Sequence, residues 1–246
     1  MNSLELHEKY QGKLEIKSIH QIDSKEMLSK IYTPGVGEVC LKIKDDESNL
    51  HKYTIAGKTI AVISNGTAVL GFGDIGPKAA LPVMEGKAAI FKELANINSY
   101  PLCINEKNPE KFIEIVKSLA LNFAAINLED ISAPNCFEIE KTLSDELDIP
   151  VIHDDQHGTA IVVLAALLGA QNLLNKENLK IVISGAGAAG TAIAKLIIEA
   201  KNQNLLPISE IKIYDSTGLI SNDRENLTPH KIELAQLSNQ SISNSF

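Results

Sequence analysis

Two pairs of adjacent carboxylic acids stand out as residues that could do chemistry. Glu129-Asp130 and Asp154-Asp155 each follow a short apolar run of the kind that forms a buried strand. The strands of a parallel sheet end at one crevice, so we expect both pairs to face the same site. Four carboxylates there need a cation to offset their repulsion, and oxygen ligands suit Mg²⁺ or Mn²⁺ rather than zinc. Helix capping is the alternative interpretation of either pair alone.

A glycine-rich turn is the second candidate site. The segment 185–190 (GAGAAG) directly follows the strand-like run 179–184 and precedes a helix-like segment. In such a turn the first glycine permits the tight bend and the second lets the backbone approach a pyrophosphate. The third lets helix and strand pack closely. A second strand-like run ends at an acid placed to bind a ribose. The pattern predicts a dinucleotide site formed by Gly185, Gly187, Ala188, Ala189, Gly190 and Asp215; a plain turn with an N-capping Asp is the alternative.

The acid at Asp215 also bears on the choice of nucleotide. A carboxylate at this position repels a 2′-phosphate, which favours NAD over NADP. A cation from the following loop, such as Lys231, could compensate for that repulsion. The sequence therefore predicts NAD or NADP as cofactor, with the balance towards NAD.

Four further residues with reactive side chains lie near these motifs. His153 and His157 flank the second acid pair, and we expect them to cap a helix or orient the carboxylates rather than bind metal. Lys87 and Tyr32 have no distinguishing spacing. By spacing alone they are interpreted as a surface lysine and a packed tyrosine.

The elements that must position these residues follow an alternating pattern. Apolar runs alternate with helix-like segments, which predicts an α/β fold whose parallel sheet is flanked by helices on both faces. We expect strands at 59–64, 101–104, 124–128, 149–152, 179–184 and 211–214, and helices at 79–95, 108–121, 136–147, 159–172 and 191–200. The helix 159–172 is nearly all apolar, so we expect it to be buried.

The chain divides into two predicted domains. Residues 1–158 would carry the acid pairs, and residues 159–246 would form an incomplete Rossmann-type dinucleotide-binding domain. Each βαβ unit takes about 30 residues, so the chain from Leu179 onward suffices for the first half of such a domain only. Residues 1–30 are expected to be irregular apart from a short helix after Ser24, and the polar tail from Ser238 is expected to be frayed.

Composition argues against several classes of protein. The 23 Lys and Arg against 31 Asp and Glu give a formal charge of −8, which lacks the basic footprint of a nucleic-acid or membrane binder. No signal-peptide pattern follows Met1, and no uninterrupted apolar run approaches the length of a membrane span. Three widely spaced cysteines argue against a disulfide framework and suit a reducing compartment. We expect a soluble, cytoplasmic protein.

Several blocks of the sequence are similar to one known family. The chain resembles the bacterial, short-subunit malic enzymes at 32–36 (YTPGV), 73–77 (GDIGP), 82–87 (PVMEGK), 128–134 (LEDISAP) and 153–159 (HDDQHGT). The blocks occur in the family's order, within a resemblance from about residue 14 to about residue 235. The resemblance implies oxidative decarboxylation of L-malate to pyruvate and CO₂ with NAD or NADP and Mg²⁺ or Mn²⁺. It also suggests a homodimer.

The resemblance assigns roles to individual residues. It implies that Lys87 is the general base at the C2 hydroxyl and that Tyr32 is the general acid at C3. It implies that Glu129, Asp130 and Asp155 hold the metal, with Asp154 beside them. A nearby divalent cation and partial burial would favour the neutral form of the lysine, as a base requires.

The sequence departs from the family in two respects. Asn65 stands where the family usually has an acid. The later family blocks that complete the substrate and nicotinamide pocket do not occur in these 246 residues. Two other hypotheses therefore stay open. The chain could be a non-catalytic remnant or one part of a split enzyme, whose missing half is a separate chain. It could also catalyse a related reaction, such as malolactic decarboxylation or plain malate oxidation.

Overall fold

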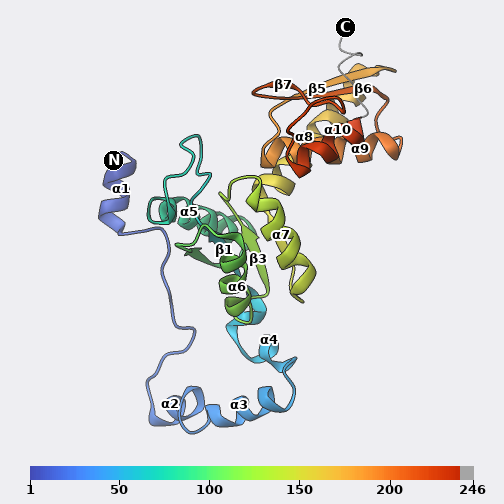
Figure 1. Ribbon diagram of the computed structural model, residues 1–246. Coiled ribbons are helices and arrows are strands. Elements are labelled where there is room, and N and C mark those ends of the chain that lie inside the picture. Colours follow the sequence, from blue (N-terminus) through green and yellow to red (C-terminus); the bar gives the residue numbers. More distant parts are fainter. Residues whose placement is uncertain (239–246) are drawn as a thin grey trace.

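The computed structural model describes residues 1–238 as two sheets, each with its own core (Figure 1). The first sheet is parallel, in the order β2-β1-β3-β4, with β1 at Thr59–Ser64, β2 at Asn98–Cys103, β3 at Ala125–Leu128 and β4 at Val151–His153. The predicted α/β fold is confirmed. The frayed tail predicted beyond Ser238 lies outside the described residues.

Helices cover both faces of the first sheet, as the apolar strands require. On one face Val62 of β1 packs with Met84 and Ala88 of α5 (Pro77–Ala95). The other face carries Ala61 and Ile63, which belong to a core built with α6 (Pro109–Ala120) and α7 (Asn135–Glu146). Successive β1 side chains thus point to opposite cores, and this holds the strand's carboxyl end in a fixed place.

The second sheet has the order β5-β6-β7. In it β5 (Leu179–Ser184) runs parallel to β6 (Ile208–Asp215), and the short β7 (Gly218–Leu219) runs antiparallel. Its core contains buried residues of β5, β6, α9 (Ala188–Asn202) and α10 (Pro229–Ser238). Among residues 1–238, β5 pairs with β6 alone and has a free second edge. This is one βαβ unit, as predicted for the first half of a dinucleotide domain.

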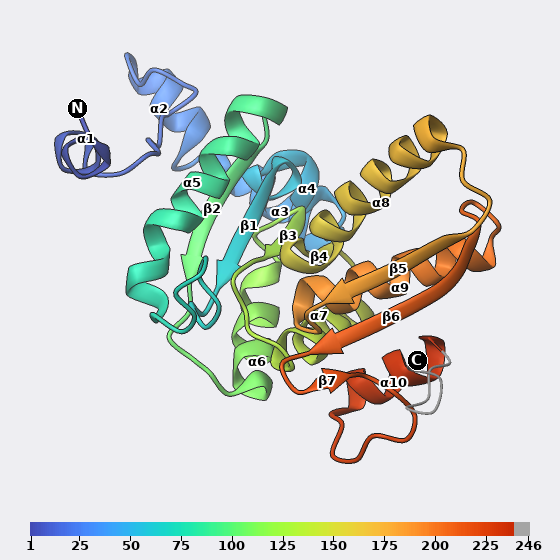
Figure 2. The ribbon, with the colours of Figure 1, turned by 90° about the horizontal axis from the view of Figure 1, so that it is seen from above.

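The helix α8 (Asp154–Leu174) connects the two parts and packs along α9 (Figure 2). The prediction that this apolar helix is buried is wrong for the described chain, because Ile161, Val162 and Leu173 are exposed, Leu173 at 88%. One side of α8 meets α9 and its first turn meets α7 and β4, while Ile161, Val162 and Leu173 stay exposed among residues 1–238. By length and composition alone α8 could cross a membrane, contrary to our expectation, although a core helix of a soluble protein passes the same test. The predicted domain boundary at 158/159 lies within this helix.

The first part of the chain forms an extended arm beside the first sheet (Figure 1). It contains α1 (Ser3–Tyr10), α2 (Lys25–Ile31), α3 (Val36–Asp45) and α4 (Asn49–Tyr53), none of which has a buried residue, and ends in the 3₁₀ turn η1 (Ile55–Lys58). The helix predicted after Ser24 is confirmed, with Ser24 as its N-cap. The helix α1 was not predicted; a capping box between Asn2 and Glu5 starts it.

Candidate active site

The two acid pairs meet around one lysine. Glu129 follows β3, Asp154 begins α8 after the neighbouring strand β4, and Lys87 projects from α5. The Nζ atom of Lys87 lies 3.0 Å from Oε1 of Glu129 and 2.6 Å from Oδ2 of Asp154. The prediction that both pairs come together is confirmed, and Lys87, which spacing could not single out, lies between them. We call the place where these side chains meet the crevice.

The second member of each pair contributes a further contact. The backbone N–H of Asp130 donates to Oδ2 of Asp155 at 2.8 Å, and the backbone N–H of Ala68 donates to the carbonyl of Asp130. Asp130 has a φ of 55°, in the left-handed region that Asp tolerates better than most residues. Its Oδ2 atom is buried and has no hydrogen-bond partner. Asp130 is thus buried next to Asp155 with one carboxylate oxygen that makes no hydrogen bond.

The electrostatics of the crevice show a shortage of positive charge. Burial raises the pKa of Glu129 to about 7, although the charge of Lys87 opposes the shift. Burial, and then the charge of Asp155, raise the pKa of Asp130 to about 6. Burial alone would lower the pKa of Lys87, but its hydrogen bond to Asp154 and the charge of Glu129 outweigh burial and raise it. One ammonium group does not satisfy the acids around it.

The donor set of the crevice fits a hard divalent cation. Its side chains offer carboxylate oxygens, which Mg²⁺ and Mn²⁺ prefer. The unpartnered Oδ2 of Asp130 and the raised pKa values of Glu129 and Asp130 also point to a cation. Within residues 1–238, no three His, Cys, Asp or Glu side chains converge closely enough to hold a metal ion. The carboxylates therefore have to turn away from Lys87 and from the Asp130 backbone to bind one.

Two buried asparagines, Asn127 and Asn65, bind the strand and loops next to the acids, and the sequence did not assign either of them to the site. The amide of Asn127 on β3 donates to Oε2 of Glu129 at 2.8 Å. Asn65, which stands where the family has an acid, accepts hydrogen bonds from the backbone and hydroxyl of Thr67. The Thr67 hydroxyl in turn accepts from the backbone of Ser132. Asn65 thus links the loop after β1 to the loop after the first acid pair. Its only sequence signal is a turn dipeptide with Gly66.

The two histidines next to the second acid pair differ in burial. The ring of His153 is fully buried, neither ring nitrogen has a partner, and Nδ1 lies 3.9 Å from Oδ2 of Asp155. Nε2 of His157 lies 2.8 Å from Oε1 of Glu140, a residue of α7. Of the four paired acids, His153 approaches only Asp155, and His157 forms its ion pair with Glu140 instead.

The structure does not bring Tyr32 to Lys87. Tyr32 is the C-cap of α2, in the arm, and is 67% exposed. The helix α2 lies apart from the first sheet in both views. It is below the sheet in Figure 1 and on the far side of α5 in Figure 2. Within one chain, therefore, the base and the acid that the resemblance implies are not assembled.

The glycine turn has the backbone geometry that its residues predicted. Gly185 has a φ of 111°, and a Cβ on Gly190 would lie 1.9 Å from the carbonyl oxygen of Gly185. Ala188 and Ala189 begin α9. A cavity of about 360 Å³ borders this turn and is lined by Ala133, Pro134, Gly185, Ala186, Gly187, Asp215, Ser216, Thr228, His230 and Lys231. The turn thus opens towards the loop that follows the first acid pair.

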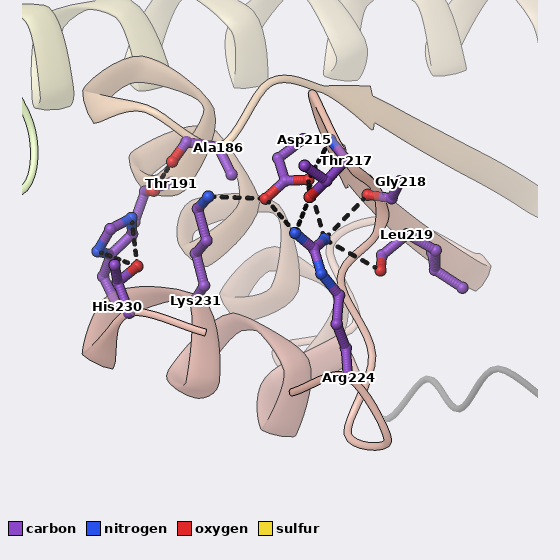
Figure 3. Close-up of polar contacts among 10 residues, drawn as sticks. Ala186, Thr191, Asp215, Thr217, Gly218, Leu219, Arg224, His230 and Lys231 are labelled. Carbon is purple, nitrogen blue, oxygen red and sulfur yellow. Dashed lines mark hydrogen bonds and ion pairs between the residues drawn. The ribbon is translucent and has the colours of Figure 1, made fainter. Parts of the chain in front are cut away.

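Asp215 ends β6 in a tight ionic cluster (Figure 3). Its Oδ1 lies 2.9 Å from Nη1 of Arg224, and its Oδ2 lies 2.7 Å from Nζ of Lys231. The Arg224 hydrogen bond, opposed in part by burial, and the bonds from Lys231 and Thr217 hold the pKa of Asp215 well below its usual range. The compensating cation considered for Lys231 is present. Arg224 was not predicted, because nothing in its sequence setting marks it.

Comparison with known proteins agrees with this geometry. The family model "Malic enzyme, N-terminal domain" matches residues 11–110 and 105–144, and "Malic enzyme, NAD binding domain" matches residues 156–245. A NAD-dependent malic enzyme of Geobacillus stearothermophilus is 50% identical over 93% of the chain and 47% of its own length. A NADP-dependent malic enzyme of Escherichia coli is 43% identical over 91% of the chain and 29% of its own length.

A solved structure gives the same result for the fold. The crystal structure of a NAD-dependent malic enzyme from Thermotoga maritima superposes with a TM-score of 0.91 at 42% identity, over 97% of this chain and 63% of that one. The chain thus spans about half the length of the first relative and under a third of the second. Because the two family models together match most of the chain, including Lys87, Glu129-Asp130 and the glycine turn, the chain belongs to the malic enzyme family.

Proposed function

We propose that this chain provides the metal, base and adenosine parts of an enzyme that oxidatively decarboxylates L-malate to pyruvate and CO₂. The observation that carries the proposal is the position of Lys87, whose ammonium lies between Glu129 and Asp154. Asp130 and Asp155 lie next to that group and contact each other. A general base, oxygen ligands for a cation and a nucleotide turn are the parts that the reaction needs.

Glu129, Asp130 and Asp155 would hold the divalent cation, Mg²⁺ or Mn²⁺. When bound, the cation would supply Lewis acidity at the C2 oxygen of malate, and NAD⁺ or NADP⁺ would supply the hydride acceptor. The unused buried oxygen of Asp130 supports its role as a ligand. Asp154 stays with Lys87 in this arrangement, because their ion pair is the shortest contact in the crevice.

Lys87 would take the proton from the C2 hydroxyl. In the absence of a cation the acids raise its pKa, which is unfavourable for a base. Once Glu129 turns its charge to a cation, burial of Lys87 acts with less opposition and favours the neutral amine. The hydrogen bond to Asp154, the largest of the causes that raise this pKa against burial, remains, so the rearrangement that binds the metal removes only the opposition that comes from Glu129.

Tyr32 would return a proton to C3. Tyr32 is on the exposed arm, apart from Lys87 of its own chain. The arm would therefore have to pack against a second copy and bring Tyr32 to the Lys87 of that copy. We propose a homodimer, because α1 to α4 bury no residue within the chain while Leu4, Ile16 and Ile19 are exposed. Burying those side chains against a second copy would supply the association energy.

The nucleotide would bind at Gly185, Gly187, Ala188, Ala189, Gly190 and Asp215, with its pyrophosphate on the first turn of α9. Arg224 and Lys231 place two positive charges beside the single negative charge of Asp215. This removes the repulsion expected of a lone acid, so the geometry supports binding of NADP as well as NAD.

In the proposed enzyme, a second βαβ half completes the pocket. The free edge of β5, where Val182 is 66% exposed, and the bare side of α8 are surfaces that a second βαβ half would cover. That half could continue this polypeptide or belong to a separate chain. The same bare surfaces favour the alternative function, a folded remnant that binds metal or a partner without turnover. We place the protein in the cytoplasm, which its free cysteines support.

The test is reduction of NAD⁺ or NADP⁺ by the purified chain with L-malate and Mn²⁺, with pyruvate measured as product. We expect turnover only when the second half of the nucleotide domain is supplied, and none from a Lys87→Ala variant. Lactate without nucleotide reduction would indicate malolactic chemistry instead. If the chain binds Mn²⁺ but shows no turnover, either alone or with the second half of the nucleotide domain, the result would favour the remnant.

A further inference from the structure

The first turn of α8 carries both members of the second acid pair but lacks a cap of its own. His153 is the N-cap residue, and its side chain makes no capping hydrogen bond. Nevertheless Asp154 and Asp155 from this turn make contacts shorter than 3 Å, to Lys87 and to the backbone of Asp130. Something outside the helix has to fix the turn.

Glu140 of α7 binds this turn at three points. Its Oε1 accepts a hydrogen bond from the backbone N–H of His153 at 2.8 Å and lies 2.8 Å from Nε2 of His157. Its Oε2 accepts from the side-chain amide of Gln156 at 2.9 Å. The carboxylate of Glu140 is only 12% exposed, so these bonds form largely out of water. A glutamate from one helix therefore caps another.

The three donors lie on one side of the helix. Gln156 and His157 contribute side chains from the first turn of α8, and His153, the N-cap residue three positions before Gln156, contributes its backbone N–H. The acids at 154 and 155 fall between them in sequence and so project to other faces of the turn. Glu140 thus holds the turn from one side while Asp154 and Asp155 reach the crevice from another.

We propose that Glu140 is a positioning residue, which fixes the first turn of α8 so that Asp154 meets Lys87 and Asp155 meets the metal site. The proposal rests on the proposed function for its chemical consequence, and on the three contacts of Glu140 for its geometry. Outer residues that orient metal ligands typically contribute tenfold to a hundredfold to metal affinity.

The experiment measures Mn²⁺ binding to the purified chain by the electron paramagnetic resonance signal of free Mn²⁺. We expect Glu140→Ala to lower the affinity at least about tenfold. Glu140→Gln should restore most of it, because its amide oxygen still accepts from the His153 backbone and the Gln156 amide can turn to match. Two control variants in α7 should keep the wild-type affinity: Glu138→Ala, which changes an exposed acid, and Ile139→Val, which weakens only packing.

A second measurement separates this inference from the proposed function. Hydrogen exchange should quicken at the amides of residues 153–157 in Glu140→Ala, while exchange in β1 and β3 stays unchanged. If the wild type binds no Mn²⁺, the proposed metal site is wrong, and the exchange result alone decides whether Glu140 fixes the turn. Equal Mn²⁺ affinity in wild type and Glu140→Ala would overturn the proposal. An equal loss in Glu140→Ala and Ile139→Val would overturn it too, since the effect would then follow general stability.

Discussion

Replacing Glu129 with Gln is expected to stabilise the metal-free chain at neutral and alkaline pH, although Glu129 is a proposed metal ligand. The residue is 7% exposed, and burial raises its pKa to about 7 from an ordinary value of 4.5. Each pKa unit corresponds to about 1.4 kcal/mol, so the ionised carboxylate lowers the free energy of unfolding by about 3 kcal/mol.

The sign of the effect follows from which pKa is higher. Because the folded-state pKa of Glu129 exceeds the unfolded value, the folded chain binds the proton more tightly. The destabilisation is therefore absent below about pH 4.5, grows as the pH rises and is complete above about pH 7. A Gln at this position cannot ionise and avoids the effect. It can still accept the hydrogen bond that Asn127 donates to Glu129.

The assay is thermal unfolding in the presence of a chelator, at about pH 4.5 and about pH 8. For a chain of this size about 3 kcal/mol corresponds to roughly 6–12 °C in Tm. We expect Glu129→Gln to melt higher than the wild type by this amount at the alkaline pH, and to match it at the acidic pH. Glu138→Gln makes the same charge change at an exposed position of α7 and should leave both values unchanged. A Glu129→Gln chain that melts lower than wild type at about pH 8 would refute the reasoning. In that case the ion pair with Lys87 contributes more than burial removes.

Three further predictions use other parts of the structure. Saturating Mn²⁺, at about a hundred times its Kd, should stabilise the wild type by about 2.7 kcal/mol in urea unfolding but leave Asp155→Ala unchanged; an equal gain in both would exclude Asp155 as a ligand. Lys231→Ala should weaken NADP⁺ binding about tenfold in a calorimetric titration with little effect on NAD⁺, because only NADP⁺ has the 2′-phosphate; an equal loss for both nucleotides would contradict this. In a thiol-labelling assay near pH 8, the exposed Cys40 should react first. Burial raises the pKa of the Cys103 thiol to about 11 and that of Cys136 to about 12, so both are less reactive. Rapid labelling of all three thiols would refute this prediction.

Much of the fold could be predicted because its local signals are strong. The run 59–64 forms β1 at the predicted residues, since it is apolar throughout and a turn dipeptide follows it. The acid pairs could be placed in one crevice because parallel strands end on the same side of a sheet. The glycine turn could be predicted because its backbone requires glycine. Gly185 has a φ of 111°, which other residues rarely adopt, and a Cβ on Gly190 would lie 1.9 Å from the carbonyl oxygen of Gly185.

The contacts between distant segments could not be predicted in the same way. Arg224 reaches Asp215 from nine positions further along the chain, beyond β7, and Glu140 reaches α8 from another helix. Nothing in the local sequence of either residue indicates its partner. The apolar pattern of α8 correctly predicted a helix, but periodicity does not say whether the covering surface is present. Tyr32 shows the same limit, because a motif can assign a role to a residue without placing it near its partner.

The crevice around Lys87 is best understood as a site whose charge is incomplete. Glu129 and Asp130 are buried with raised pKa values, and Lys87 has a raised pKa because it is the only cation paired with Glu129 and Asp154 in the described contacts. Burying ionised carboxylates costs several kcal/mol each unless opposite charge accompanies them, and one ammonium is too little. A core evolved for stability alone would replace such acids with apolar residues. Their presence here, with Asn127 donating to Glu129 and the backbone of Asp130 donating to the neighbouring Asp155, is explained if a divalent cation supplies the missing charge. The strain of the metal-free site and the affinity of the metal-bound site would then have the same physical origin.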